Sequence, residues 1–130
     1  MPKPVVIVGA LDTKGEEFRF VRDLIAAQGL DTILVDFGVM ADPPFPADVG
    51  ADAVARAGGH PLAELRAAGD KTLAMETMAA GLAAVVKELH AGGRLGGILG
   101  MAGSGGTAIA TRAMRALPIG VPKVMASTVA

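Results

Sequence analysis

Cysteine, tryptophan and tyrosine are absent from this 130-residue chain, and phenylalanine occurs only four times. The lack of cysteine excludes disulfide bonds and thiolate metal sites, and it favours a cytoplasmic protein. The scarcity of aromatic rings argues against binding of single-stranded nucleic acid, whose bases stack on such rings. The net charge of −1 and the absence of a basic stripe argue against duplex binding. We therefore expect no nucleic-acid partner.

Long hydrophobic runs are also missing. No apolar segment approaches the roughly 20 residues that a membrane-spanning helix needs. The apolar run near the start, in MPKPVVIVGALD, is too short for a signal peptide and ends at Asp12. We expect neither a membrane anchor nor export. A chain of this length is expected to form one domain, residues 1–130, around one hydrophobic core.

The chain alternates short apolar runs with segments of helical spacing. Apolar runs that do not alternate with polar residues are typical of strands buried on both faces of a parallel sheet. The expected strands span residues 4–10, 31–36, 95–101 and 121–126. Expected helices span residues 52–57, 62–67, 71–91 and 106–116, with another between the first two strands that ends at Gly29. The pattern predicts an α/β fold, with an open, mostly parallel, Rossmann-like sheet flanked by helices.

Residues 37–51 are expected to be irregular because glycine and proline interrupt them repeatedly. The methionines of the 71–91 helix recur at helical spacing and are interpreted as core side chains. The chain ends directly after an expected strand, so we interpret it as an N-terminal fragment of a longer protein that lacks part of its site.

The most informative segment is GGILGMAGSGGT, residues 96–107. A strand that leads through glycines into a helix leaves bare backbone N–H groups at the helix N-terminus, where the helix dipole favours a phosphate. The segment matches neither the P-loop, because no lysine follows the glycines, nor GxGxxG. The alternative interpretation is a tight turn with Thr107 as an ordinary N-cap. The expected phosphate-binding residues are Gly103, Ser104, Gly105, Gly106 and Thr107.

Polar residues also follow the first strand. Because the carboxyl ends of parallel strands meet at one edge of a sheet, Asp12, Thr13 and Lys14 are expected near the glycines. The Lys14 ammonium would contact a phosphate, Thr13 would offer a hydroxyl, and Asp12 would bind a metal ion or ribose. The alternative is a capped helix start with Asp12 or Thr13 as the N-cap.

The other strand ends carry weaker signals. Asp36 ends the second expected strand, where an acidic residue binds ribose in dinucleotide folds, although a turn-capping aspartate fits equally well. Ser127 and Thr128 follow the last strand and would face the same crevice or form a polar strand end. The two histidines, His60 and His90, have no acidic neighbour at metal-ligand spacing. We identify no catalytic residue and no metal-ligand cluster.

Two segments together, GALDTKGEEFRFVRDLI and GILGMAGSGGTAIATRAMRALPIGVPKVMASTVA, resemble the N-terminal domain of a family that includes the tomato mosaic virus resistance protein. The resemblance implies a Rossmann-like, ATP-binding domain of a longer protein. By position it implies that the 103–107 segment holds phosphates and that Asp12, Thr13, Lys14 and Glu17 line the crevice. It also implies that Asp36 and Gly38 lie near the ribose or base, and Ser127 and Thr128 near the phosphates.

These observations lead to one expectation and two alternatives. We expect ATP binding through the glycine segment, with Mg²⁺ bridging the phosphates and Asp12, in a homodimer whose nucleotide regulates or supports a second domain. The first alternative is an enzyme that acts on a small phosphorylated substrate, with catalysis completed by a C-terminal domain. The second is a protein-interaction module that changes conformation with nucleotide and binds a protein partner.

Overall fold

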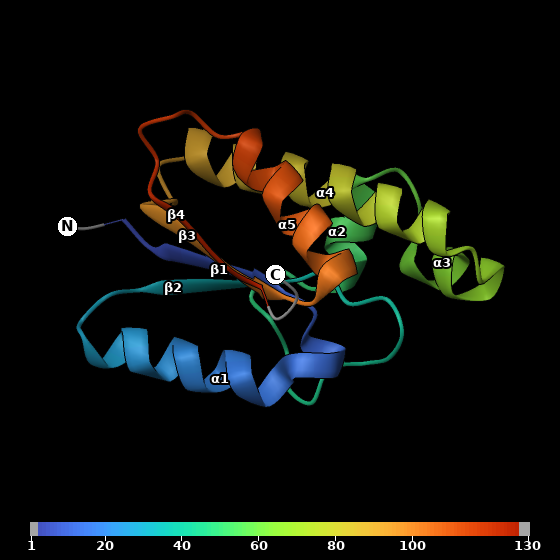
Figure 1. Ribbon diagram of the computed structural model, residues 1–130, viewed down its shortest axis with the longest axis horizontal. Helices are drawn as coiled ribbons and strands as arrows, with labels where there is room; N and C mark the ends of the chain where they lie inside the picture. The colour runs from blue at the N-terminus through green and yellow to red at the C-terminus, as the bar shows by residue number, and fades with distance from the viewer. Residues whose placement is uncertain (1–2, 128–130) are drawn as a thin grey trace.

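The computed structural model describes residues 3–127, apart from the side chain of Ser104. These residues form a four-stranded, fully parallel sheet in the order β2-β1-β3-β4 (Figure 1). The strands are β1 (Val5–Gly9), β2 (Thr32–Asp36), β3 (Gly97–Ala102) and β4 (Lys123–Ser127). The α/β prediction, with an open parallel sheet flanked by helices, is therefore confirmed.

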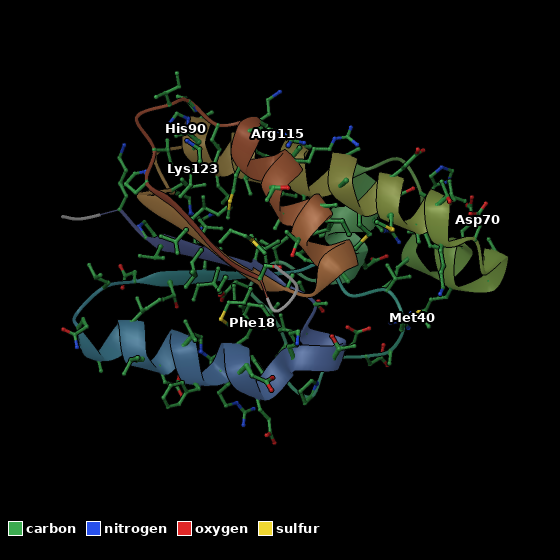
Figure 2. All side chains as sticks on the ribbon, viewed as in Figure 1. Phe18, Met40, Asp70, His90, Arg115 and Lys123 are labelled. Carbon is green, nitrogen blue, oxygen red and sulfur yellow. The ribbon has the colours of Figure 1, made fainter. Side chains whose placement is uncertain are left out.

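Helices cover both faces of the sheet. α1 (Leu11–Ala27) lies on one face, and α4 (Lys71–Ala91) and α5 (Ser104–Arg115) lie on the other (Figure 1). The short helices α2 (Ala51–Ala57) and α3 (Leu62–Ala68) connect β2 to α4. On the α1 face, Phe18 is fully buried between the helix and the sheet, against Ile7 and Leu34 (Figure 2). A larger core lies on the opposite face, between the sheet and the other helices.

The start of α1 differs from the expected capped helix start. The helix begins at Leu11, directly after β1, with a kink at Lys14 (φ −130°, ψ 28°). Neither Asp12 nor Thr13 is its N-cap, so that prediction is wrong: the N-cap is Ala10, whose carbonyl oxygen accepts from the amides of Thr13 and Lys14. The Asp36 side chain accepts from the Leu11 amide at 3.0 Å, so a distant residue caps this helix.

The helix after the glycine-containing strand end also begins earlier than the expected residue 106. α5 begins at Ser104, so residues 104–107 form its first turn, and the N-cap is Gly103. The prediction of Thr107 as the N-cap is therefore wrong. Its hydroxyl instead donates to the Gly103 carbonyl oxygen at 2.6 Å, the i−4 hydrogen bond that threonine makes within a helix.

The close packing of α2 on α4 depends on two glycines. A Cβ atom at Gly81 of α4 would overlap the carbonyl oxygen of Val54, and one at Gly58 would overlap the carbonyl oxygen of Thr77. Backbone therefore packs directly on backbone where these helices meet. This contact holds α4 close to the segment that leads into α3.

Candidate functional site

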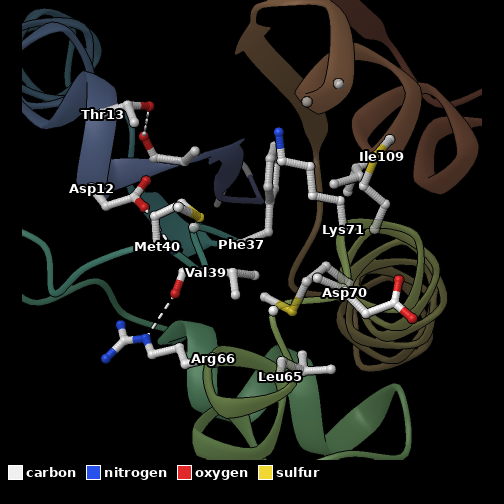
Figure 3. A pocket seen from close by; sticks show the side chains of 18 residues that line it. Asp12, Thr13, Phe37, Val39, Met40, Leu65, Arg66, Asp70, Lys71 and Ile109 are labelled. Carbon is white, nitrogen blue, oxygen red and sulfur yellow. Dashed lines mark hydrogen bonds between the residues drawn. The ribbon is translucent and has the colours of Figure 1, made fainter.

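A cavity of about 460 Å³ opens at the carboxyl ends of the strands. The connection from β1 to β2 carries α1 on one face, and the connection from β2 to β3 crosses to the other side of β1 with α4 on the opposite face. The direction in which strands are added to the sheet thus reverses between β1 and β3. Ligands of open α/β sheets bind in the crevice at such a switch point. The cavity is lined by residues that follow β1 and β2 and by parts of α3, α4 and α5 (Figure 3).

The two glycines of the first turn of α5 that line the cavity differ in their surroundings. At Gly105 an added Cβ would meet only the methyl carbon of Met75, at 3.9 Å. At Gly106 it would lie 2.8 Å from the Cβ of Ala102 and 3.3 Å from the Phe37 ring. Gly106 is thus needed for packing, whereas Gly105 leaves bare backbone facing the cavity. The first hydrogen bond of the helix is from the Thr107 amide to Gly103, so the Gly105 and Gly106 amides precede the hydrogen-bonded ladder.

Asp12 joins the start of α1 to the segment after β2. Its Oδ2 atom accepts from the Met40 amide at 3.0 Å and from the Ala41 amide at 3.2 Å. Its Oδ1 atom is buried and has no hydrogen-bond partner among residues 3–127. A Cβ atom at Gly38 would overlap this oxygen, so only glycine allows so close an approach. Asp12 therefore both shapes the cavity wall and keeps one acceptor unused.

Asp36 lies behind the cavity and does not line it. The residue is 1% exposed, and its Oδ1 atom accepts from the amides of Leu11 (3.0 Å) and Gly38 (2.8 Å). Burial raises the pKa of this carboxyl above its ordinary value, and the two amide hydrogen bonds oppose that rise. These contacts are those of a turn-capping aspartate. Asp36 positions two segments, the start of α1 and the end of β2, that carry cavity residues.

Two cations from the α3–α4 region line the cavity. Two donors of Arg66 hold it to the segment after β2: its Nε donates to the Val39 carbonyl oxygen at 2.7 Å, and its Nη1 donates to Asp42 Oδ1 at 3.1 Å. Lys71 begins α4, directly after the N-cap Asp70, which accepts from the Leu73 amide at 3.1 Å. The Lys71 side chain extends toward the first turn of α5 (Figure 3).

The structure brings together part of the set expected from the sequence. Five of the expected residues line the cavity, namely Asp12, Thr13, Gly38, Gly105 and Gly106. Gly103, Lys14, Asp36, Thr107 and Ser127 lie outside its lining. The Thr107 and Ser127 hydroxyls lie 3.0 Å apart and join α5 to β4. The Ser104 side chain and Thr128 lie outside the described part of the chain.

Sequence reasoning missed the wall formed by the 37–40 segment, α3 and the start of α4. Phe37, Val39, Leu65, Lys71 and Met75 line the cavity. In the sequence, the four apolar residues of this set are indistinguishable from ordinary core residues. Glycine and proline also interrupt the segment after β2, so no periodicity marks it. Met78 is buried, as expected of a core methionine, but Met75 is 40% exposed and faces the cavity. The available signal was the spacing of Lys71, Met75 and Met78, which places them on one face of α4.

Within residues 3–127, no group of three or more histidine, aspartate or glutamate side chains is arranged to hold a metal ion. No helix in that range combines the length and apolarity needed to cross a membrane.

An α/β domain with a cavity at its switch point is a class that many families share. Residues 3–130 match the model of the N-terminal domain of the uncharacterised protein family UPF0261. The chain belongs to this family. It is 46% identical over 130 residues to a UPF0261 protein of Clostridium tetani, covering all of this chain and 32% of that protein. It is 38% identical over 130 residues to a UPF0261 protein of Mesorhizobium japonicum, covering 98% of this chain and 31% of that protein. The chain thus spans about a third of the length of these relatives.

The resemblance to the tomato protein is more restricted. The ToMV resistance protein Tm-1(GCR237) of Solanum lycopersicum is 58% identical to this chain over 36 residues, which are 28% of this chain and 5% of that protein. The match therefore supports a local relationship, whereas the family assignment rests on nearly the whole chain.

Proposed function

We propose that the cavity binds an adenine nucleotide, and ATP is the ligand to test first. The observation that carries the proposal is Gly105, whose bare backbone faces the cavity at the N-terminus of α5. Amides at such a terminus bind phosphate oxygens, and the absence of a Cβ lets a phosphate approach closely. The location at the switch point of the sheet supports the same ligand class.

The apolar wall suits the base. Phe37, Val39, Leu65 and Met75 enclose the cavity on the side of α3 and α4. A planar ring gains from burial against aliphatic and aromatic side chains, and a thioether adapts to its edge. Asp12 lines the cavity, and its carboxylate is of the ligand type that a ribose hydroxyl, or a Mg²⁺ ion that also binds the phosphates, would require. The bound nucleotide would then regulate, or support, a further part of the protein.

The direct test is calorimetric titration of ATP, with and without Mg²⁺. It is carried out on the 130-residue chain and on a polypeptide of the relatives' full length. We expect binding to both, because the residues invoked lie within this chain. Binding to the longer polypeptide alone would mean that further residues complete the site. The absence of binding to either would refute the proposal.

Substitution of Gly105 tests the position of the phosphate. We expect Gly105→Val to weaken ATP binding by about ten-fold or more, because the side chain occupies the space through which a phosphate reaches the backbone. Gly105→Ala is expected to have a smaller effect in the same direction. Stability should be retained in the alanine variant, since its Cβ meets only the methyl carbon of Met75, at 3.9 Å.

The control for this pair is Gly120→Ala, because a Cβ at Gly120 meets no atom within 4 Å and Gly120 lies outside the cavity lining. ATP titration and urea unfolding are measured on all three variants. Unchanged ATP affinity in Gly105→Val would remove the first turn of α5 from the site.

A further inference from the structure

The glycine turn, which is the first turn of α5 with Gly105 and Gly106, lacks a cation of its own. In a P-loop, the lysine that contacts the phosphates follows the last glycine directly. Here the residues after Gly106 are threonine, alanine and isoleucine, none of which carries a charge. The sequence suggested Lys14 for this role. Lys14 instead lies at the kink of α1, and it is not among the residues that line the cavity. A phosphate at α5 would need its cation from another element.

The start of α4 faces the first turn of α5. Met75 reaches to 3.9 Å from where a Cβ atom of Gly105 would lie, so the two helices meet at the cavity. Lys71 precedes Met75 by four residues and therefore lies on the same face of α4. Both residues line the cavity, and the Lys71 side chain extends toward α5 (Figure 3). Its position is thus suited to a group bound at the glycine turn.

The neighbouring charges are already engaged. Arg66 is held by Val39 and Asp42, as described above. Asp70 caps α4, and one oxygen of Asp12 receives two backbone amides. Lys71 forms no ion pair or hydrogen bond with any residue of the described range 3–127. Of the two cations among residues 3–127 that line the cavity, Lys71 has all its donors available to a ligand, whereas two donors of Arg66 are engaged by Val39 and Asp42.

We infer that Lys71 supplies the cation for the phosphate chain of the ligand, acting across the cavity from the first turn of α5. The inference rests on the proposed nucleotide site and deepens it. The site then recognises a nucleoside polyphosphate in preference to the nucleoside, because the ammonium contacts only the phosphate end. Lysine serves this purpose as a flexible point charge with three donors.

The test compares three probes in calorimetric titrations of the full-length protein at fixed ionic strength. Adenosine probes the base and ribose, tripolyphosphate probes the phosphate end, and ATP probes both. We expect Lys71→Met to weaken ATP and tripolyphosphate binding about ten-fold, the scale of a charge-assisted hydrogen bond, with adenosine affinity unchanged. Lys71→Arg should retain most of the affinity for ATP. Lys87→Met, an exposed lysine of the same helix outside the cavity lining, is the charge-matched control and should bind all three probes normally.

Failure of the inference and failure of the proposed function give different results. If Lys71→Met weakens neither ATP nor tripolyphosphate, the inference is wrong, while nucleotide binding by the unmodified protein still stands. An equal loss for adenosine and ATP would also overturn it, because the effect would not be specific for phosphate. A ten-fold loss in Lys14→Met with none in Lys71→Met would return the role to Lys14. If tripolyphosphate alone binds, the proposed adenine site fails, and the effect of Lys71→Met on tripolyphosphate still decides the inference.

Discussion

Gly81→Ala is expected to lower the free energy of unfolding by about 3 kcal/mol, at the upper end of the range for overpacking. The added Cβ would overlap the carbonyl oxygen of Val54 and lie 3.0 Å from the Gly58 amide nitrogen. Both atoms belong to backbone, so no side-chain rotation can relieve the clash. α2 and α4 must move apart, which disrupts the core between them.

The same substitution should affect ligand binding. α4 carries Lys71, Met75 and Met78, so its displacement changes one wall of the cavity. Urea unfolding and ATP titration measure the two effects. The control is Gly92→Ala at the C-terminal end of α4, where a Cβ would make an ordinary 3.5 Å contact with the Glu88 carbonyl oxygen. If Gly81→Ala unfolds with the same midpoint as Gly92→Ala, the close backbone contact between α2 and α4 is not present in solution.

Asp36→Ala is expected to destabilise the fold by about 2–4 kcal/mol, because it leaves two buried amides, those of Leu11 and Gly38, without an acceptor. These amides belong to the start of α1 and to the segment after β2. Both segments form part of the cavity, so ATP affinity should fall with stability. Asp36→Asn is the matched variant, since its amide oxygen can accept the same two hydrogen bonds. A loss as large in Asp36→Asn as in Asp36→Ala would show that the charge, and not the acceptor, is needed.

The pH dependence of stability separates these roles further. Burial raises the pKa of Asp36 above its ordinary value of 3.8, so the folded protein holds this proton at pH values where the unfolded chain has lost it. The protonation of Asp36 therefore contributes most to stability below pH 3.8, and this proton-linked part is lost as the pH rises through the pKa of the folded state. We expect the unfolding free energy of the wild type, relative to Asp36→Asn, to fall across this window. A rise would mean that the amide hydrogen bonds outweigh burial.

Much of the fold followed from local sequence. The apolar runs around Val6, Leu34 and Leu99 do not alternate, which is the pattern of strands covered on both faces, and each proved to be a parallel strand. Gly29 and the glycines after α4 end helices where they were expected to. The glycine turn at Gly105 and Gly106 was also predicted from the sequence, because a strand that is followed by glycines and then by a helix can adopt few other local structures. Each of these features depends on residues that are close together in the sequence.

Local sequence therefore determined the order of strands and helices, the parallel sheet and the glycine turn at its edge. The tertiary structure alone decided which side chains share the cavity with that turn. It placed Lys71 opposite Gly105, left Lys14 at a kink, and made Asp36 the cap of a helix that begins 25 residues earlier. It also bound Asp12 to amides 28 and 29 residues away. Such contacts depend on how helices cross and where strands end, and the spacing of residues along the chain contains neither.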